Sequence, residues 1–384
     1  MDFTESDLHV DLREAVAKLA ATFGHDYYAE MSRVDGRATE LWQALADHGY
    51  LSVNLPETYG GGGQGIGELA VVCEEVAAQG CPLLLILVSC AISGELIARF
   101  GTEDQQRAWL PRLVAGEKVV FAITEPDAGS NSHDISTTAR RDGEDWLLNG
   151  TKHYISGVDE AAAVLVVART GSHDVTGRAQ LSLFVVDTDA AGLDKTVIPV
   201  EIRAPEKQFT LFFDDVALGP DRLVGTEGDG LRQVFRGLNP ERIMGAALSN
   251  GLGRYALDKA GAYARERSVW GVPIGTHQGV AHPLAQAKVD LELARLMTTK
   301  AAWLHDAGAE GAGEAANMAK LAAADAALAA LDAAIQTHGG NGMASEYGLA
   351  DLWGMARMLR IAPVSREMVL NYVAQHCLGL PRSY

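Results

Sequence analysis

The sequence has few cysteines and few aromatic residues, and each scarcity excludes a class of protein. Its 384 residues include four cysteines, none of which stands in a CxxC or Cys/His metal-binding pattern. This density is too low for a disulfide scaffold, so we expect reduced cysteines in a cytoplasmic protein without a metal site. Aromatic residues make up 7% of the chain, so alanine, leucine and valine must form most of its core.

Long apolar runs are also missing. The most apolar stretch begins at Cys81 and is shorter than the about 18 residues that a membrane-spanning helix needs, so it predicts a buried helix. The first residues are acidic and lack the basic and apolar regions of a secretion signal. We therefore expect neither a membrane partner nor export.

Basic residues are in deficit. Asp and Glu outnumber Lys and Arg by 50 to 32, which gives a net charge of −18. A surface of this charge repels phosphate backbones and anionic lipid headgroups, so we expect no nucleic-acid partner. An anionic substrate would need a local basic patch.

The hydrophobic periodicity changes twice along the chain. Residues 1–115 and 226–384 carry apolar residues at steps of three and four, which is typical of helices. Residues 116–225 hold short segments rich in β-branched and aromatic residues, which predict closely spaced strands. We expect an α+β protein with three domains at these boundaries: a helical N-terminal domain, an antiparallel β-barrel-like middle domain and an up-and-down C-terminal helical bundle.

Two dipeptides in the middle zone predict hairpin turns. Asn149-Gly150 stands between two strand-like segments and suits a type I′ turn, because both central positions of that turn need a positive φ. Asp142-Gly143 offers a second turn of this kind.

Two glycine-rich stretches have both structural and functional interpretations. The GxGxxG string within residues 59–67 has no parallel-strand zone near it, so we interpret it as a flexible entry to a helix and not as a dinucleotide fingerprint. The QTHGGNG segment at residues 336–342 fits the C-terminal end of a helix, and its glycines could also present N–H groups to a phosphate.

The segment FAITEPDAGS at residues 121–130 predicts a strand that a proline stops, followed by a tight turn. Its small residues would let a ligand approach the backbone. In a regular strand Tyr154 and Ser156 would share one face, which would suit a planar cofactor. An ordinary turn and an ordinary strand face are the alternatives.

The segment LNPERIMG predicts the start of a helix. Asn239 suits the N-cap and Pro240 the first helical position. Glu241 would then lie in the first turn, where its charge favours the helix dipole. A catalytic role is the alternative, because the side chains of Glu241 and Arg242 diverge by about 100° and one of them could enter a cavity.

Taken together, five segments resemble the acyl-CoA dehydrogenase family in their order and approximate spacing. They are LPETYGGGG, FAITEPDAGS, LNGTKHYISG, the ERSVWGVPIGTHQ stretch from Glu266, and QTHGGNG. The resemblance implies a helical N-terminal domain, a β-barrel-like middle domain and a C-terminal four-helix bundle. It also implies that FAD binds between the middle and C-terminal domains, across a subunit interface.

The resemblance assigns the cofactor contacts residue by residue. Those in the middle zone are Phe121, Ile123, Thr124, Ser130, Tyr154 and Ser156, and Ser365 follows near the C-terminus. Those expected to reach the FAD of a neighbouring subunit are Arg267, Trp270, Gln278, Gln336, Gly339 and Gly340. The resemblance therefore implies a homodimer or homotetramer.

One departure from the family decides the predicted base. Most members carry a catalytic Glu near the C-terminus, where this chain has Pro363. A minority, including isovaleryl and long-chain types, place the base before an Arg on a bundle helix, and Glu241-Arg242 matches that arrangement. We predict Glu241 as the base, Arg242 and Ser130 as substrate contacts, and Glu367 as the alternative base. Proline also lacks the backbone N–H that helps bind the thioester oxygen in the family.

The predicted activity is FAD-dependent α,β-dehydrogenation of an acyl-CoA or acyl-carrier-protein thioester to the trans-2-enoyl product. This makes the protein an oxidoreductase of fatty acid metabolism that passes electrons to an electron-transferring flavoprotein. The departure at Pro363 could instead mark an oxidase, desulfinase or monooxygenase of the same fold. A non-catalytic partner subunit is a separate alternative. The length and branching of the acyl chain stay open.

Overall fold

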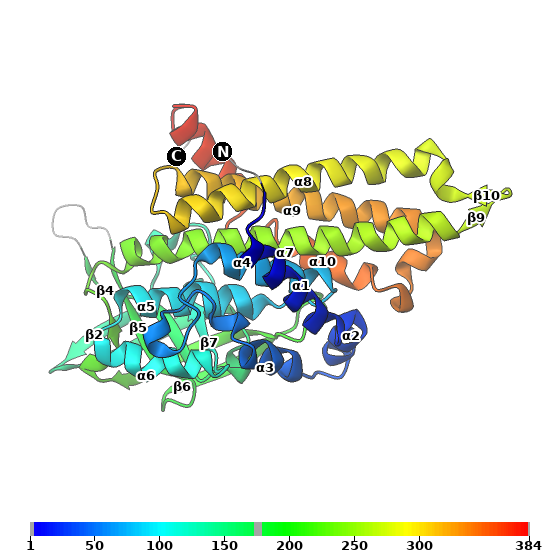
Figure 1. The fold of residues 1–384 in the computed structure, drawn as a ribbon. Helices are drawn as coiled ribbons and strands as arrows, with labels where there is room; N and C mark the ends of the chain where they lie inside the picture. The colour runs from blue at the N-terminus through cyan, green and yellow to red at the C-terminus, as the bar shows by residue number, and fades with distance from the viewer. Residues whose placement is uncertain (1–3, 173–178, 383–384) are drawn as a thin grey trace.

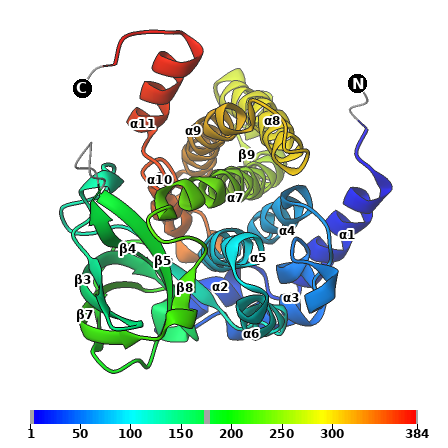
Figure 2. The same ribbon diagram turned by 90° about the vertical axis from the view of Figure 1, so that its left-hand side faces the viewer.

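A computed structural model describes residues 4–172 and 179–382 of the chain. Three long helices cross the whole molecule, and the N-terminal helices and a β-sheet lie against one of them (Figure 1). Seen from the end, the sheet and the N-terminal helices flank α7 on opposite sides (Figure 2). The helices before the sheet are α1 (Asp7–Ala21), α2 (Gly24–Arg33), α3 (Thr39–Asp47), α4 (Ile66–Ala78), the π-helix η3 (Ile86–Gly94), α5 (Glu95–Phe100) and α6 (Glu103–Val114).

The glycine-rich stretch before α4 is a loop that enters a helix, as predicted. Gly65 is the N-cap of α4, and glycine offers no side chain to accept from the first N–H groups. The carboxylate of Asp306, at the end of α8, takes that place by accepting from Ile66 N at 2.9 Å and from Gly67 N at 2.8 Å. The GxGxxG string therefore serves a helix start.

The middle of the chain forms one eight-stranded sheet in the order β6-β7-β3-β2-β4-β5-β8, with β1 paired to β4. Most neighbours are antiparallel, but β4 pairs in parallel with β1 and with β2, which the expected antiparallel barrel did not include. The strands are β1 (Val119–Ala122), β2 (Thr138–Asp142), β3 (Asp145–Ser156), β4 (Ala163–Ser172), β5 (Ala179–Asp187), β6 (Leu193–Ile198), β7 (Gln208–Leu218) and β8 (Leu223–Val224).

One of the two predicted hairpin turns is wrong. The turn at Asp142-Gly143 joins β2 to β3, and Asp142 pairs with Asp145. Asn149-Gly150 instead lies inside β3, at a shift of its register with β7. The Asn149 amide is bonded to Asp215 on β7, to its backbone N at 2.9 Å and to its carboxylate at 2.8 Å, so the strand continues through a bulge.

The C-terminal part is helical. The expected four-helix bundle is represented, within the described residues, by three long helices and two short ones. They are α7 (Gly230–Glu266), α8 (Gln278–Asp306), α9 (Ala312–His338), α10 (Trp353–Met358) and α11 (Arg366–Tyr372), with the two-stranded ribbon β9 (Ser268–Val269) and β10 (Val272–Pro273) between α7 and α8. Gly339 caps the end of α9, as the QTHGGNG segment predicted.

The predicted helix start at Asn239 is wrong. Helix α7 begins at Gly230, so Pro240 and Glu241 lie in its interior. Pro240 removes one backbone hydrogen bond, but the helix continues because most residues of its following stretch, 243–253, are buried against its neighbours. Glu241 is therefore not explained by the dipole of a first helical turn.

The predicted fold class is confirmed: helical, β-sheet and helical parts follow one another in an α+β protein. The changes between them fall between α6 and β1 and between β8 and α7. We keep residues 1–115, 116–225 and 226–384 as proposed domains. In the described part of the chain, no helix is long and apolar enough to cross a membrane.

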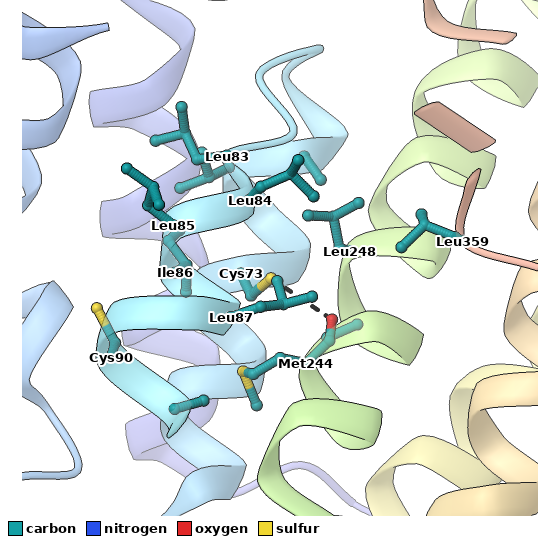
Figure 3. Packing of buried hydrophobic residues seen from close by; sticks show 14 of the residues in the cluster. Cys73, Leu83, Leu84, Leu85, Ile86, Leu87, Cys90, Met244, Leu248 and Leu359 are labelled. Carbon is teal, nitrogen blue, oxygen red and sulfur yellow. Dashed lines mark hydrogen bonds between the residues drawn. The ribbon is translucent and has the colours of Figure 1, made fainter. Parts of the chain in front are cut away.

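The helical layers share a continuous apolar core. Leu84 and Leu87, at the start of the π-helix region, point towards Met244 and Leu248 of α7, and Leu359 approaches from the other side (Figure 3). The run from Cys81 is thus the buried helix that its composition predicted. This packing fixes α7 at Met244 and Leu248, within two turns of Glu241.

Candidate active site

A buried ion pair holds the turn after β1. Glu125 begins the tight turn of the FAITEPDAGS segment, which two backbone hydrogen bonds with Ala128 close. Its carboxylate accepts hydrogen bonds from Ser136 and Thr137 and from Lys152 Nζ at 2.9 Å. Lys152, which is fully buried on β3, also donates to Ile123 O at 3.0 Å. The pair therefore ties the end of β1 to β3.

The surroundings of this pair keep both groups charged at neutral pH. Burial alone would raise the pKa of Glu125, but the charge of Lys152 and the hydrogen bonds from Ser136 and Thr137 outweigh it and lower the pKa to about 2. Burial lowers the pKa of Lys152 to about 8, against the attraction of Glu125. Neither residue was among those that the sequence predicted for the site.

The predicted cofactor residues of the middle zone gather beside this turn. Phe121 lies on β1 and is buried, Ile123 and Thr124 follow it half-buried, and Ser130 is exposed after the turn. Thr124 O accepts from His153 N at 2.8 Å, which ties this edge to the stretch that carries Tyr154.

Tyr154 and Ser156 do not follow a regular strand alternation. The register of β3 with β7 shifts between Lys152 and Ile155, and Tyr154 has a φ of 57° in that bulge. Its ring is 58% exposed, so it offers a flat face to a ligand. Ser156 Oγ donates to Gln208 Oε1 at 3.0 Å.

Glu241 and Pro363 lie on one side of α7. A Cβ atom added to Gly245, one turn after Glu241, would stand 3.4 Å from Pro363 Cδ. Lys320 of α9 is buried nearby and donates from Nζ to the carbonyl of Val364. Helix α7 therefore brings Glu241 close to the position at which most family members carry their base.

The Glu241 carboxylate has no hydrogen-bond donor among residues 4–172 and 179–382. Glu241 is half-buried, and desolvation by the protein around it raises its pKa to about 7, although the charges of Arg242 and Lys320 act in the opposite direction. Burial lowers the pKa of Lys320 to about 8, with Glu241 opposing that shift. A carboxylate with a pKa near the working pH is suited to accept a proton.

Arg242 has a free donor in the same region. Its Nη1 donates to Asn239 Oδ1 at 3.1 Å, while its buried Nε has no partner in the described part of the chain. Burial lowers the pKa of the guanidinium, and Glu241 raises it. A buried N–H without a partner is costly, so it marks a place where a ligand oxygen would be stabilising.

Ser365 and Glu367 open the short helix α11. Ser365 is its N-cap and accepts from Met368 N at 3.3 Å. Glu367 is exposed in the first turn, where its charge favours the helix dipole. The alternative base therefore has a structural explanation that Glu241 lacks.

The remaining predicted cofactor residues lie at the far end of the bundle. The rise along α7 from Glu241 to its last residue is roughly 40 Å, at 1.5 Å per residue. Arg267, Trp270 and Gln278 follow that end, with Trp270 88% exposed. Gln336, Gly339 and Gly340 lie at the end of α9 and are exposed. One chain does not bring this set to Glu241.

The chain folds as a helical part, a β-sheet and a second helical part, in this order, and Glu241 lies in the second helical part. This order of parts is the fold class of the acyl-CoA dehydrogenases. The family models for the N-terminal, middle and C-terminal domains of acyl-CoA dehydrogenase match residues 6–117, 120–216 and 228–378. Acyl-CoA dehydrogenase FadE12 of Mycobacterium tuberculosis (strain ATCC 25618 / H37Rv) is 56% identical over 384 residues, which cover 100% of this chain and 99% of that protein.

Two solved structures extend the likeness. A glutaryl-coenzyme A dehydrogenase in complex with glutaryl-CoA has 29% identity and a TM-score of 0.92, over 100% of this chain and 98% of that one. A glutaryl-CoA dehydrogenase from Mycobacterium smegmatis in complex with FADH2 has 26% identity and a TM-score of 0.91, over 99% and 96%. The chain belongs to the acyl-CoA dehydrogenase family. It is an oxidoreductase whose cofactor is FAD.

The chain's own surface fits this cofactor. A Cβ added at Gly129, Gly339 or Gly340 would meet no atom within 4 Å, so a ligand can approach the backbone there. The exposed rings of Tyr154 and Trp270 offer flat apolar faces of the kind that an isoalloxazine or adenine packs against. Which of the predicted residues contact FAD stays a prediction.

Lys320 is the residue near Glu241 that sequence analysis missed. It stands in an alanine-rich helix, and it continues the helical spacing of the buried residues Ala316, Ala323 and Ala327. A single lysine on the apolar stripe of a helix is the signal that could have found it, since lysine is almost never fully buried without a partner.

Proposed function

We propose that the chain dehydrogenates an acyl-CoA or acyl-carrier-protein thioester between its α and β carbons, with Glu241 as the base. The observation that carries this proposal is the state of Glu241: a desolvated carboxylate in mid-helix, without a hydrogen-bond donor in the described chain, with its pKa raised to about 7. The product would be the trans-2-enoyl thioester.

The chain's own groups would divide the work as follows. The α-proton of a thioester is very weakly acidic, so its removal needs a carboxylate that water does not stabilise. Glu241 Oε would accept this proton. The unpaired Nε of Arg242 would bind an oxygen of the thioester's carrier, with Ser130 at the other predicted contact. FAD, when bound, supplies the acceptor for the hydride of the β-carbon.

The presence of Pro363 explains why the base would be carried by α7. A proline at that position has no carboxylate and no backbone N–H. Its ring lies next to Gly245 of α7, one turn from Glu241, so the proposed base stands near the position at which most family members carry theirs. The thioester oxygen must then rely on another donor, such as a hydroxyl of the FAD ribityl chain.

We further propose a homodimer or homotetramer of this chain. Four large apolar residues of α8 are exposed at steps of four, three and seven, so one face of that helix is unpartnered in the single chain. The cofactor residues at the far end of the bundle lie roughly 40 Å from Glu241, and a second copy could bring them to its FAD. The four residues are Val289, Leu293, Leu296 and Trp303.

The proposal includes an electron-transferring flavoprotein as the electron acceptor, as expected of the family. It also includes a cytoplasmic location, which the state of the cysteines supports. All four are free, and Cys73, Cys81 and Cys90 are buried.

The test is anaerobic reduction of the purified flavoprotein by a panel of acyl-CoAs, followed by loss of the visible flavin absorbance. We expect bleaching by at least one thioester, and little by any of them with Glu241→Gln. Bleaching that survives Glu241→Gln but is lost with Glu367→Gln would move the base to α11. No bleaching by any thioester would favour an oxidase, desulfinase or monooxygenase, and a colourless protein would favour a non-catalytic subunit.

A further inference from the structure

A small pocket lies where the end of α5 meets the start of α7, and three of the residues that line it are arginines. It has a volume of about 210 Å³. Helix α5 packs beside α7 at this place. We call it the arginine pocket and define it by Arg99, Phe100, Arg232, Gln233 and Arg236. It brings positive charge to one place on a chain whose net charge is −18.

The guanidinium groups of the arginine pocket keep donors that the protein does not use. Arg236 makes no hydrogen bond and no ion pair among residues 4–172 and 179–382. Arg99 Nη2 lies 3.6 Å from Glu95 Oε1, beyond hydrogen-bond distance, and Arg232 binds Asp229 through Nε and Nη2, which leaves its Nη1. Two carboxylates thus offset at most two of the three charges. The pocket keeps a positive excess and several N–H groups for an anion.

Gln233 adds an acceptor to this set of donors. The residue is 2% exposed, and its Oε1 is buried without a hydrogen-bond partner in the described part of the chain. A Cβ added at Gly225 would clash with the Gln233 amide, so this glycine makes the room in which the amide lies. A buried acceptor without a partner is destabilising, so a ligand that donates a hydrogen bond to it would be favoured.

A histidine next to the arginine pocket reports its positive field. His305 lies in the last turn of α8, and its burial, followed by the charges of Arg99 and Arg236, lowers its pKa to about 4. His305 is therefore neutral at pH 7 and adds no charge of its own. A bound anion would reduce the repulsion between the two arginines.

The arginine pocket lies on another side of α7 from the proposed base. Successive residues turn by 100° round an α-helix, so Arg232 and Arg236 stand roughly 180° and 140° from Glu241. A thioester with its α-carbon at Glu241 would lie against a different face of the helix. The two places are therefore separate, although one helix carries both.

We propose that the arginine pocket binds a small phosphate monoester with a hydroxyl group on the carbon next to the ester carbon. Such a phosphate carries nearly two negative charges at pH 7 and three terminal oxygens, which match three guanidinium groups. The hydroxyl group donates to Gln233 Oε1. The volume lies below the about 300 Å³ at which sites for drug-sized ligands begin, so the ligand is smaller than a nucleotide.

The first test is isothermal titration of the FAD-loaded protein with glycerol 3-phosphate, glycerol and sulfate at equal ionic strength. Glycerol lacks the phosphate, and sulfate lacks the hydroxyl group. We expect glycerol 3-phosphate to bind, sulfate to bind at least about 10-fold more weakly, and glycerol not to bind. Absence of binding by glycerol 3-phosphate would overturn the proposal, and equal affinity for sulfate would overturn the role of Gln233.

The second test separates the contributions of the two side chains. Arg236→Gln should weaken glycerol 3-phosphate and sulfate alike, by about 10-fold or more, because it removes a charged donor from both. Gln233→Met should weaken glycerol 3-phosphate alone. Arg265→Gln is the matched control: it removes an exposed arginine from the same helix, roughly 44 Å away, and should change neither affinity.

Thermal unfolding without ligand checks that each variant is folded. Since Arg236 is exposed, Arg236→Gln should unfold as the wild type does, and unchanged affinity in this variant would contradict the proposal. Displacement of glycerol 3-phosphate by CoA would also contradict it, because the arginine pocket would then belong to the site of the thioester. All these readouts are binding heats, so their failure leaves the proposed function untouched.

Discussion

Two carboxylates with a lysine nearby, the buried Glu125 and the half-buried Glu241, have pKa values shifted in opposite directions. Glu125 accepts four hydrogen bonds after β1, from Ser136, Thr137 and Lys152, and its pKa is lowered to about 2. Glu241 in α7 accepts none within the described residues, and its pKa is raised to about 7. The difference comes first from the direct ion pair of Glu125 with Lys152 at 2.9 Å, and then from the hydrogen bonds of Ser136 and Thr137. Among the described residues no ion pair joins Lys320 to Glu241, where desolvation has the largest influence on the pKa.

This difference is what we expect between a structural carboxylate and the proposed catalytic base. Backbone and hydroxyl donors stabilise the charged form of Glu125 and cannot be released without unfolding the turn. Glu241 receives only the longer-range attraction of Arg242 and Lys320. Glu125 ties the end of β1 to β3, where the predicted cofactor residues lie, and Glu241 is the group that we propose to gain and lose a proton.

The largest expected effect comes from removing the proton acceptor itself. Glu241→Gln keeps the shape of the side chain and should lower the rate of flavin reduction about 1,000-fold or more, within the range of general-base catalysis. Folding and FAD content should not suffer, because a desolvated carboxylate costs stability when it is charged. Stopped-flow flavin reduction, with thermal unfolding as control, measures both. A rate near that of the wild type would refute the role of Glu241.

The second-largest effect is expected from the replacement of Glu125, and it should appear as a loss of folding stability. Glu125→Gln leaves the buried ammonium of Lys152 without its counter-charge, which typically costs about 3 to 5 kcal/mol. The folded pKa of about 2 lies below the usual 4.5, so the wild type holds this stabilisation above pH 4.5 and loses it as the pH falls towards 2.

Unfolding midpoints of both proteins at pH 7 and at pH 3 measure this effect. The gap between them should be widest at pH 7. An equal midpoint at pH 7 would mean that the ion pair does not hold the turn.

The sequence predicted the Glu125 region and the Glu241 region unequally. The FAITEPDAGS turn is local, and its proline and small residues predicted it correctly. The helix start at Asn239-Pro240 was a good local signal, yet α7 runs through it because its following residues are buried among distant helices. Local capping preference, worth about 1 kcal/mol, is smaller than this burial.

The partners of the two carboxylates were beyond the reach of sequence analysis. Lys152 comes from β3 and Lys320 from α9, far along the chain from the groups they influence. The bulge that gives Tyr154 a φ of 57° depends on the pairing of β3 with β7. Periodicity gives the faces of elements, whereas such pairings follow from tertiary packing. The family resemblance supplied the prediction of Glu241 as the base, but neither of these two lysines.

Glu206 is a further carboxylate that tests this comparison. Its replacement should have a smaller effect than the replacement of Glu241 or Glu125. Glu206 accepts one hydrogen bond, from Leu84 N at 2.8 Å, and its Oε2 has no partner among the described residues. Burial and the charge of Glu160 raise its pKa to about 7, although Lys118 acts in the opposite direction. It resembles Glu241 in pKa but lies between the N-terminal helices and the sheet.

Glu206→Gln should therefore change stability and not catalysis. Since its folded pKa lies above the usual 4.5, the wild type loses stability as the pH rises from 4.5 to about 7. Gln does not ionise, so the variant should be about 3 kcal/mol more stable at pH 8 and equal at pH 4. Thermal unfolding at both values measures this, with turnover as the control. Lost turnover would show that a raised pKa at this place serves catalysis.

The smallest effect should come from the lysine beside Glu241. In the wild type kcat/KM should rise with pH through about 7, because the base is active only when deprotonated. Lys320→Met removes a positive charge that favours the carboxylate, so the pKa of Glu241 should increase and the inflection should move to higher pH by up to about one unit, or 1.4 kcal/mol.

If Lys320 has only a structural role, its replacement should change stability and not the pH dependence of kcat/KM. The loss of its hydrogen bond to Val364 O would lower the unfolding midpoint and leave the inflection in place. Lys288→Met, on an exposed part of α8, is the matched control and should change neither quantity. If the pH inflection of kcat/KM shifts in Lys320→Met, the positive charge of Lys320 helps to set the pH at which Glu241 works as a base. Glu241 would then depend on nearby charges, whereas Glu125 depends on a direct ion pair and hydrogen bonds.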